Sequence, residues 1–356
     1  MENKQKKIVL TGGGSAGHVT PNLALVPELL QHGIDVHYIG TDDGIEKTLV
    51  HDIPFHAISA GKMRRYASVK NITDIFKIFK GTKESKRILK GLKPDLVFAK
   101  GGFVSVPVVW AASKLKIPVI LHESDYTPGL ANRLCIKKAQ KICLSFDTAD
   151  ARSERSILTG SPIRKDILDG DRAAGLASLS FSGDKPVLLI MGGSLGAQAI
   201  NDAVDAALDT LTQRYDIVHL RGKGKLNPGL EGSDSYRQYE YMEDGLPDVF
   251  AAADIALSRS GANAIFEFLA LKLPALLVPL PLSASRGDQI LNAGYFEKRG
   301  YAHVLEQENL NALALVQALD ALWEQKDEMV SVMGNSKEAD GTSNVLNVIF
   351  ENIGVQ

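Results

Sequence analysis

The chain has 356 residues, of which 45% are hydrophobic and 6% aromatic, a composition typical of a globular protein with room for two α/β domains. No apolar run reaches about 18 residues, so we expect no membrane-spanning helix, and the apolar run near the N-terminus is too short for a signal-peptide core. The two cysteines, Cys135 and Cys143, form no CxxC pair, which favours a reduced cytoplasmic protein without a disulfide or a zinc site.

The net charge of −2 is unevenly distributed along the chain. Residues 1–160 contain 24 lysines and arginines against 15 acidic residues, whereas the remainder contains 16 against 27. This asymmetry predicts an anionic surface or ligand for the N-terminal half.

Residues 8–21 read IVLTGGGSAGHVTP, a short apolar run that ends in a glycine loop before a predicted helix over 19–32. Glycines let a ligand approach the backbone closely, and a helix N-terminus supplies free N–H groups and a positive dipole end. The combination indicates an anion site, either of the ordinary nucleotide-binding kind or one that presents His18 to a ligand. A second such loop, MGGSLG at 191–196, opens the other half and suggests two ligands meeting in a cleft.

The N-terminal half alternates predicted strands and helices. Strands are expected at 7–11, 36–39, 96–99, 119–121 and 142–144, with a further helix ending near residue 115. This alternation predicts a parallel, doubly wound sheet, in which ligands bind beyond the carboxyl ends of the strands.

Gly160 and Pro162 interrupt regular structure, and we predict a hinge between two domains over 158–166. Residues 169–184 are expected to form a loop, and its Asp169 and Asp171 are interpreted as solvated rather than as a metal-binding DxD pair. The second half then repeats the alternation, with strands at 187–191, 217–220, 255–257 and 276–278. Helices are predicted over 197–211, after 261 and after 289, and the last twenty residues are predicted to be helical.

The stretch 258–267 carries a second candidate site. Ala262, Asn263 and Ala264 would form a helix N-terminus whose exposed amides suit a diphosphate. Glu267, one turn further on, could accept hydrogen bonds from two ribose hydroxyls or be an ordinary surface glutamate. Arg259 is either a phosphate partner or a solvated charge at the end of a strand.

Six motifs, in this order and spacing, resemble those of the MurG family of peptidoglycan N-acetylglucosaminyltransferases: TGGGSAGH, KGGF, HESD, GGSLG, RSGANAIFE and RGDQILNA. The resemblance covers nearly the whole chain, and HESDYTPGLAN in place of an HEQN string is similar to the Gram-positive branch. It implies the α/β GT-B fold, two Rossmann-like domains with parallel sheets facing a cleft. It further implies an acceptor and membrane-associating domain over 1–162, a UDP-GlcNAc-binding domain over 163–340, and a C-terminal helix at 341–356 that could return to the first domain.

The resemblance also implies a reaction. GlcNAc would pass from UDP-GlcNAc, with inversion, to the C4 hydroxyl of undecaprenyl-diphospho-MurNAc-pentapeptide (lipid I), with no metal, other cofactor or nucleic acid, at the cytoplasmic face of the membrane. A UDP-sugar transferase with another lipid acceptor, a UDP-GlcNAc epimerase and, less in keeping with the glycine register, a dinucleotide dehydrogenase are the alternatives.

The resemblance assigns the donor pocket to Arg164, Ser194 and Gln289, and places Met242 where the backbone contacts uracil. Ala264 replaces a threonine that often helps to hold the phosphates, and this leaves that task to backbone amides. On the acceptor side Gly14 belongs to the first loop, and Asp125 stands where many members have asparagine, so that its role is open.

His18 is the expected general base, because the N-terminal end of the helix dipole disfavours imidazolium and keeps the ring neutral. The alternative is that His18 only binds the acceptor diphosphate or caps the loop. Glu123, at the end of the strand 119–121, is the second candidate base and is expected to face the same cleft.

A basic, partly apolar helix is predicted near residues 70–86. Ile72, Ile75, Phe76 and Phe79 fall on one helical face, and five lysines surround it: Lys70, Lys77, Lys80, Lys83 and Lys86. An apolar stripe ringed by lysines is typical of a helix resting on an anionic membrane. The alternative is a packing helix with a solvated rim.

Overall fold

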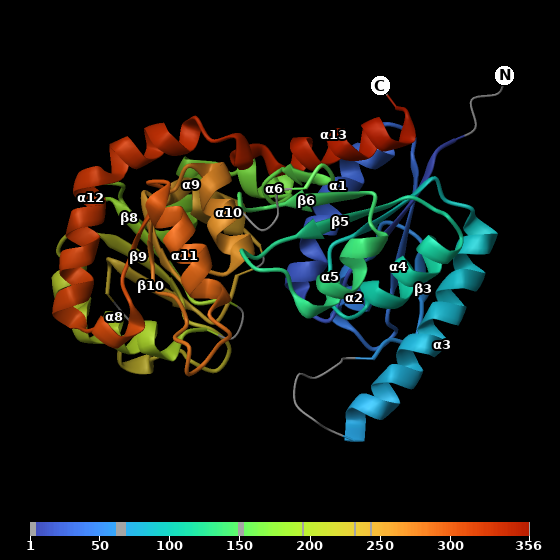
Figure 1. Cartoon of the computed structure of the whole chain (residues 1–356). Coiled ribbons are helices and arrows are strands. Elements are labelled where there is room, and N and C mark those ends of the chain that lie inside the picture. Colours follow the sequence, from blue (N-terminus) through green and yellow to red (C-terminus); the bar gives the residue numbers. More distant parts are fainter. Residues whose placement is uncertain are drawn as a thin grey trace. The chain divides into compact units, whose positions relative to one another are not determined.

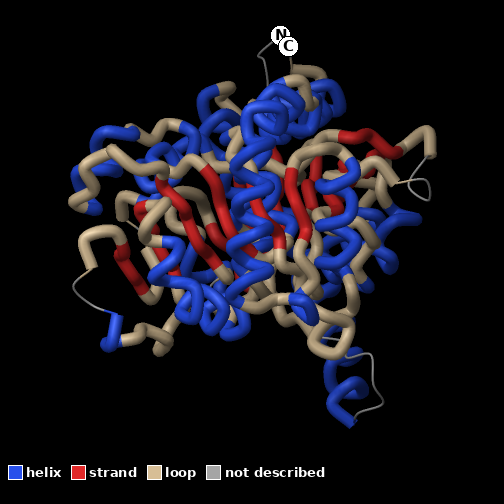
Figure 2. The backbone as a smooth tube through the Cα atoms, turned by 90° about the vertical axis from the view of Figure 1, so that its left-hand side faces the viewer, coloured by secondary structure: helices blue, strands red, loops and turns tan. Residues whose placement is uncertain are grey.

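The computed structural model describes residues 5–61, 69–148, 153–193, 196–230, 233–242 and 244–355, with only the backbone described at 69–73 and 75. The chain divides into two compact units, Met1–Arg164 with Asp340–Gln356, and Lys165–Ala339. In each unit the strands lie side by side in one sheet, with helices packed on it (Figures 1 and 2). The prediction of parallel α/β sheets is confirmed.

Over its described residues, the first unit contains a seven-stranded parallel sheet in the order β3-β2-β1-β4-β5-β6-β7. Its strands are β1 (Lys7–Thr11), β2 (Asp35–Gly40), β3 (Phe55–Ala57), β4 (Leu96–Ala99), β5 (Val119–Glu123), β6 (Lys141–Leu144) and β7 (Ser156–Leu158). Its helices are α1 (Thr20–Gln31), α2 (Ile45–Leu49), α3 (Val69–Leu92), α4 (Ser105–Lys114), α5 (Leu130–Cys135) and α13 (Gly341–Ile353), with 3₁₀ turns η1 (Ala16–His18) and η2 (Ile136–Lys138).

Both faces of this sheet are covered, because successive residues of a strand point to opposite sides. Ile8 and Leu10 pack with residues of α1 and α13 on one face. Val9, between them, packs with residues of α3 and α4 on the other. The central strands therefore read as continuous apolar runs, as expected for a parallel sheet buried on both faces.

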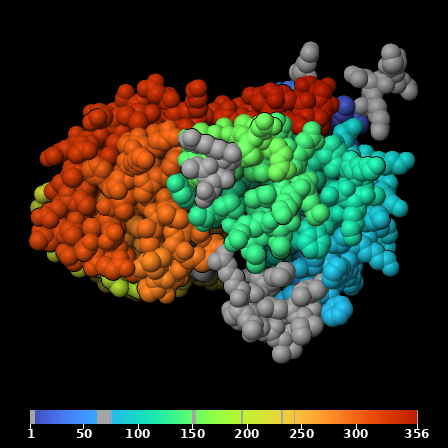
Figure 3. Space-filling model, in the orientation of Figure 1, coloured from blue at the N-terminus to red at the C-terminus, as the bar shows by residue number. Residues whose placement is uncertain are grey.

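Helix α13, although last in sequence, is part of the first unit. The Thr342 hydroxyl accepts from the Ile163 N–H and donates to the Ile163 carbonyl, both at 2.8 Å, and the Asn344 amide donates to the Thr159 carbonyl at 2.9 Å. Val345 and Ile349 lie in the apolar core. In Figure 3 these C-terminal residues, in red, lie directly against the green surface of the same unit.

In the described residues of the second unit, a six-stranded parallel sheet has the order β10-β9-β8-β11-β12-β13. Its strands are β8 (Val187–Met191), β9 (Asp216–Leu220), β10 (Tyr236–Tyr239), β11 (Ile255–Ser258), β12 (Ala275–Leu277) and β13 (Ala302–Val304). Its helices are α6 (Lys165–Leu168), α7 (Arg172–Leu179), α8 (Gln198–Leu211), α9 (Leu246–Ala252), α10 (Ala262–Leu271), α11 (Asp288–Lys298) and α12 (Ala312–Gly334), with 3₁₀ turns η4 (Pro228–Leu230) and η5 (Gln307–Asn309), and η6 (Lys337–Asp340) leading out of the unit. Apolar residues of α8 and α12 pack together with one face of the sheet.

The prediction of a loop over 169–184 was wrong, because α7 lies within it. Asp171 is the N-cap of this helix: its carboxylate accepts from the Ala174 N–H at 2.7 Å, and its own N–H donates to Asp248 Oδ1 at 2.8 Å. The aspartate side chain therefore stabilises a helix start, which is the ordinary role of this residue type at that position.

Among the helices of the described ranges, none has the length and apolar character needed to cross a bilayer. The longest, α3, has 24 residues, but lysines recur along it. Its first turns project beyond the sheet in both Figure 1 and Figure 2.

Candidate active site

The glycine loops of the two halves occupy the same topological position. In the first unit the strand order reverses between β1 and β4, and in the second between β8 and β11. Open parallel sheets bind ligands at such switch points, beyond the carboxyl ends of the strands. The loops that follow these four strands are TGGGSAGH, KGGF, GGSLG and RSGAN, so four of the six motifs meet in pairs.

The two loops of the first unit pack against each other through glycines. Gly14 has φ +83°, and a Cβ there would collide with the ring of Phe103. A Cβ on Gly102, which has φ +75°, would collide with the carbonyl of Gly13. Both positions therefore require glycine for conformation and for space.

A cavity of about 300 Å³ opens beside these loops, within the first unit. It is lined by backbone of both glycine loops and by apolar side chains: Gly13, Gly14, Ser15, His18, Gly61, Ile78, Gly102, Phe103, Val106, Leu130, Ala131 and Leu134. His18 is the imidazole in this lining. An apolar wall beside a histidine suits a ligand that combines a polar group with an apolar one.

The position of His18 fixes what its ring can do. It ends η1 and is separated from α1 by the N-cap Val19, and its Nδ1 lies 2.8 Å from the Ser15 hydroxyl oxygen. For Nε2 to accept a proton from a substrate, Nδ1 must carry the ring hydrogen and donate it to Ser15. The serine can accept this bond, and the geometry is therefore compatible with His18 as a general base.

Glu123 does not share the cavity of His18. It lines a second cavity, of about 310 Å³, together with Tyr126, Thr127 and Arg155 among others. Its Oε2 accepts from the Asn132 amide at 2.8 Å and the Gly129 N–H at 3.1 Å, and its Oε1 accepts from the Asp125 N–H at 3.2 Å.

These three hydrogen bonds make Glu123 the organising carboxylate of the loop after β5. Burial raises the pKa of Glu123, against the lowering effect of the Asn132 hydrogen bond. His18 and Glu123 thus line different cavities of the first unit, and the role of Glu123 as the second candidate base stays a prediction. Asp125, half-buried, contributes its backbone to this loop.

A buried cation that the sequence analysis missed lies nearby. Lys100 of the KGGF loop is almost fully buried, and its Nζ contacts the Ser124 hydroxyl and lies 3.0 Å from His122 Nδ1. His122 Nε2 lies 2.9 Å from the Gly160 carbonyl and donates to it. Burial lowers the pKa of Lys100 to about 8 and that of His122 well below its ordinary value. In the sequence, Lys100 directly follows the apolar run 96–99, and this position was the signal that could have predicted a buried lysine.

In the second unit, the GGSLG loop follows β8 with Gly193 at φ +82° and Gly196 at φ +66°. A Cβ on Gly196 would collide with the carbonyl of Arg221, at the end of the neighbouring strand β9. Ser194, the predicted diphosphate contact, lies outside the described residues.

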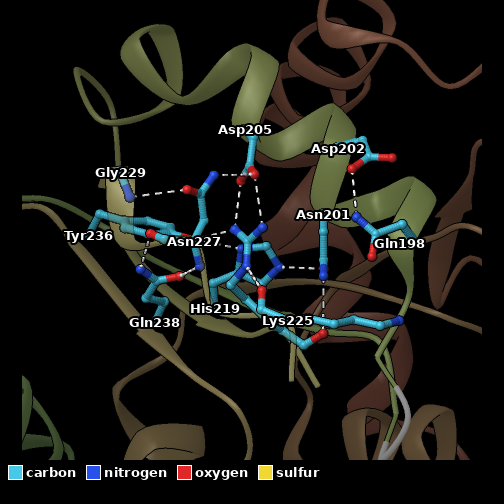
Figure 4. Close-up of polar contacts among 11 residues, drawn as sticks. Gln198, Asn201, Asp202, Asp205, His219, Lys225, Asn227, Gly229, Tyr236 and Gln238 are labelled. Carbon is cyan, nitrogen blue, oxygen red and sulfur yellow. Dashed lines mark hydrogen bonds and ion pairs between the residues drawn. The ribbon is translucent and has the colours of Figure 1, made fainter. Parts of the chain in front are cut away.

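A buried polar network supports this loop from the side of β9 (Figure 4). Arg221 forms a bidentate ion pair with Asp205 of α8, with N–O distances of 2.6 and 2.8 Å, and donates to the Tyr236 hydroxyl at 3.0 Å. The Asn201 amide donates to the Arg221 carbonyl at 3.1 Å and thereby fixes the carbonyl that Gly196 approaches. His219 bridges Tyr236 and Asn201 and, because it is buried, its pKa falls to about 3.

The Asp205 carboxylate of this ion pair accepts hydrogen bonds from two side chains, Arg221 and Asn227. Burial raises the pKa of Asp205, but these hydrogen bonds outweigh that effect and keep the pKa below its usual range. The network therefore places a permanently charged guanidinium behind the second glycine loop.

Helix α10 begins next to this loop, at the other side of the switch point. Its N-cap is Gly261, which offers no side chain to the first turn, and the first-turn residues are Ala262, Asn263 and Ala264. The amides of such a turn are available to an anion. Glu267 lies one turn into the helix and is half-buried.

Arg259 is not a solvated charge, and that alternative was wrong. The side chain is 8% exposed, and its guanidinium donates to the carbonyls of Val278 and Pro279 at 3.0 and 3.2 Å and to Gln307 Oε1 at 2.6 Å. It joins the ends of β11 and β12 and so supports the start of α10.

Gln289 lies in the first turn of α11 beside that start. Its Oε1 accepts from the Leu280 N–H at 3.0 Å, which fixes the amide and directs the NH₂ group elsewhere, and its carbonyl accepts from the Ser260 hydroxyl at 2.8 Å. Met242, half-buried, follows β10, and Arg164 is an exposed residue at the end of the first unit's N-terminal segment.

Chemically, the two switch points differ. The first unit offers a half-buried imidazole beside an apolar cavity, which suits proton abstraction from a hydroxyl. The second offers helix N-termini backed by a guanidinium, which suits a diphosphate.

Comparison with known proteins places this chain among sugar transferases. The Glycosyltransferase family 28 N-terminal domain matches residues 8–144, and the Glycosyltransferase family 28 C-terminal domain matches residues 187–345. The UDP-N-acetylglucosamine–N-acetylmuramyl-(pentapeptide) pyrophosphoryl-undecaprenol N-acetylglucosamine transferase of Lachnospira eligens is 51% identical over 351 residues, 98% of this chain and 99% of the relative. The protein of the same name from Clostridium perfringens is 48% identical over 350 residues, 97% of this chain and 98% of the relative.

Solved structures agree in fold. The crystal structure of Acinetobacter baumannii MurG has a TM-score of 0.76 and 27% identity, and the match covers 97% of this chain and 99% of that one. A UDP-N-acetylglucosamine 2-epimerase has a TM-score of 0.63 at 15% identity, covering 98% of this chain and 96% of the other, which shows a common fold alone.

Proposed function

The chain belongs to glycosyltransferase family 28, and we propose that it transfers N-acetylglucosamine from UDP-N-acetylglucosamine to lipid I. The observation that carries the proposal is the identity of about half of all positions, over nearly the full chain, with transferases named for this reaction. The fold is GT-B, as the solved relatives are, and the resemblance inferred from the six motifs is confirmed.

The chemical step is a displacement at the anomeric carbon. The C4 hydroxyl of the acceptor MurNAc attacks C1 of GlcNAc from the face opposite UDP, so that the configuration inverts. As the O4–C1 bond forms, the C1–O bond to the diphosphate breaks, its electron pair leaves with UDP, and the hydroxyl proton passes to His18 Nε2. Such general-base assistance accounts for about 10²–10⁴ in rate.

We place the remaining donor contacts in the second unit, apart from Arg164, which ends the N-terminal segment of the first. The first-turn amides of α10 (Ala262, Asn263 and Ala264) hold the diphosphate, with Ser194 beside them, because free N–H groups and the dipole favour the anion. Glu267 accepts from the ribose hydroxyls, Gln289 donates to sugar hydroxyls, and the backbone at Met242 contacts uracil. Arg164 adds positive charge as the leaving group forms. Gly14 and Asp125 serve the acceptor side, and Arg259 acts through the α10 start that it supports.

The direct test supplies labelled UDP-GlcNAc with and without lipid I and follows the label. We expect lipid-linked label that depends on lipid I. Formation of a 2-epimer without acceptor would indicate an epimerase, and label appearing on diacylglycerol but not on lipid I would indicate another lipid acceptor.

The proposal extends to the membrane surface that carries the acceptor. Phe76 and Phe79 of α3 are 69% and 61% exposed, although large apolar side chains are normally buried. Lys77, Lys80 and Lys83, on the same stretch, are exposed. Ile72, Ile75 and Lys70 lie where side chains are not described. Exposed aromatic side chains among lysines favour a peripheral contact with an anionic bilayer over a helix that only packs internally.

Sedimentation with anionic liposomes tests this contact. Each lysine near the surface contributes about 1 kcal/mol, screened by salt, so Lys77→Glu, Lys80→Glu and Lys83→Glu together should abolish binding. The matched control replaces Lys114, Lys137 and Lys138 of the same unit by glutamate, with the same change in net charge and little loss expected. Equal loss in both triple variants would indicate non-specific attraction.

A further inference from the structure

We propose that Glu46 is a positioning residue for the acceptor side, because its buried carboxylate sets the shape of the first glycine loop on which His18 depends. The inference rests on the proposed function. Glu46 is fully buried and lies on the short helix α2, some thirty residues after the loop.

The carboxylate is fully engaged by donors from two loops. Its Oε2 accepts from the Gly14 N–H at 3.2 Å. Its Oε1 accepts from the Thr41 N–H at 2.9 Å and from the Thr41 hydroxyl at 2.6 Å. The glutamate therefore ties the loop after β1 to the loop after β2.

Three glycines make room for this side chain. A Cβ on Gly13 would lie 2.6 Å from the carboxyl carbon of Glu46, and a Cβ on Gly40 would lie 2.6 Å from its Cγ. A Cβ on Gly44 would collide with its Oε1. None of the three has a positive φ, so the backbone conformation does not call for glycine at these positions. The space taken by Glu46 does, together with Phe55 beside Gly40 and Thr41 beside Gly44.

The path from Glu46 to the base is short. Glu46 holds the amide of Gly14, the next residue is Ser15, and the Ser15 hydroxyl holds the His18 ring. The carboxylate also engages the Gly14 N–H that an anion-binding loop would otherwise offer to its ligand. The first glycine loop is thus held in the shape that presents His18.

The test measures steady-state kinetics of Glu46→Gln with both substrates. The glutamine keeps the size, but its NH₂ group must face an N–H or hydroxyl donor, so the loop must shift. We expect kcat/KM for lipid I to fall about 10–100-fold, with the KM for UDP-GlcNAc unchanged. The control is Glu338→Gln in the second unit, another buried carboxylate, which accepts from the hydroxyls of Tyr295 and Ser336 and pairs with Arg299. It should leave lipid I kinetics unchanged.

A second pair of variants does not depend on the folding of Glu46→Gln. Gly13→Ala keeps the Glu46 charge and adds a methyl group whose nearest atoms are those of the Glu46 carboxylate, and Glu46→Asp shortens the acidic side chain away from that position. Each should lower lipid I turnover, and the double variant should be no worse than the poorer single one, because both act on one contact.

Wild-type acceptor kinetics in Glu46→Gln, or strictly additive effects of Gly13→Ala and Glu46→Asp, would overturn the proposal. So would a parallel loss for both substrates that follows the melting temperature, since that is the signature of a merely structural carboxylate. Absence of transfer to lipid I by the wild-type protein would instead count against the proposed function.

Discussion

The two glycine loops share a topology but rest on opposite charges. The first loop follows β1, which has β2 and β3 on one side and β4 to β7 on the other. The second follows β8, which has β9 and β10 on one side and β11 to β13 on the other. Beneath the first loop lies the carboxylate of Glu46, and behind the second lies the guanidinium of Arg221. The comparison indicates that two glycine loops with the same topology can serve different ligands. The buried side chain beside each loop decides which backbone N–H groups remain for a ligand.

The physical reason lies in how the loop amides are used. The carboxylate of Glu46 accepts from an N–H of the first loop and so fixes the turn that leads to Ser15 and His18. The buried group beside the second loop is a hydrogen-bond donor, which cannot take up an N–H, so the first-turn amides of α10 remain for a diphosphate.

The largest expected effect tests the first loop. His18→Ala should lower kcat about 10²–10⁴-fold, because the proton of the attacking hydroxyl loses its acceptor. The KM for UDP-GlcNAc should remain near the wild-type value, and the acidic limb of the pH–rate profile should vanish. A variant that keeps its kcat and loses only affinity for lipid I would make His18 a binding residue and would break the division between the loops.

The next effect tests the second loop. Arg221→Leu removes the ion pair with the half-buried Asp205 and the hydrogen bonds to the Tyr236 hydroxyl and the Lys225 carbonyl, which costs about 1–3 kcal/mol of unfolding free energy. Because these bonds hold the segment that Gly196 approaches, the KM for UDP-GlcNAc should rise. Thermal melts and donor kinetics measure both. Arg214→Leu, which removes a surface ion pair with Asp320, is the control and should leave both unchanged. If the variant is destabilised but keeps wild-type donor kinetics, the Arg221 network contributes to stability and not to donor binding.

Glu267→Ala tests donor binding by the second unit in another way, because it removes a proposed ribose contact from α10 and leaves the GGSLG loop unchanged. Unpaired ribose hydroxyls should weaken the donor interaction by about 1–3 kcal/mol, seen as a higher KM for UDP-GlcNAc. The turnover of lipid I at saturating donor should change little. If neither KM nor kcat changes, Glu267 is a surface glutamate.

The smallest effect concerns the second buried cation. Arg221 has a carboxylate partner, whereas Lys100 contacts a histidine and a serine, and its pKa is lowered from 10.5 to about 8 by burial. Because the folded pKa lies below the unfolded one, the stability linked to Lys100 is present above pH 10.5 and is lost as the pH falls through about 8.

Lys100→Met removes this titration. The unfolding free energy of the wild type relative to Lys100→Met should therefore rise by about 1–2 kcal/mol between pH 7.5 and pH 9.5, roughly 1.4 kcal/mol for each titrated unit. Denaturant unfolding at the two pH values measures it. A difference that does not depend on pH would show that Lys100 keeps its ordinary titration despite burial.

The sequence by itself determined the fold class and the order of the central elements. Strands such as β1, β4 and β8 are apolar on both faces, and a glycine loop and a helix follow each, so that periodicity and composition were sufficient. The family followed from six motifs whose residues lie at loop positions set by those strands.

The tertiary structure decided the short elements and the supporting charges. The edge strands β3 and β13 have three residues each and are strands because a neighbour pairs with them. Helix α7 is rich in alanine and has no strong apolar periodicity to reveal it. Glu46, Lys100 and Arg221 are charged residues, which a local pattern assigns to solvent. They are buried because partners from distant segments neutralise or hydrogen-bond them, and such partners meet only after the sheet has formed.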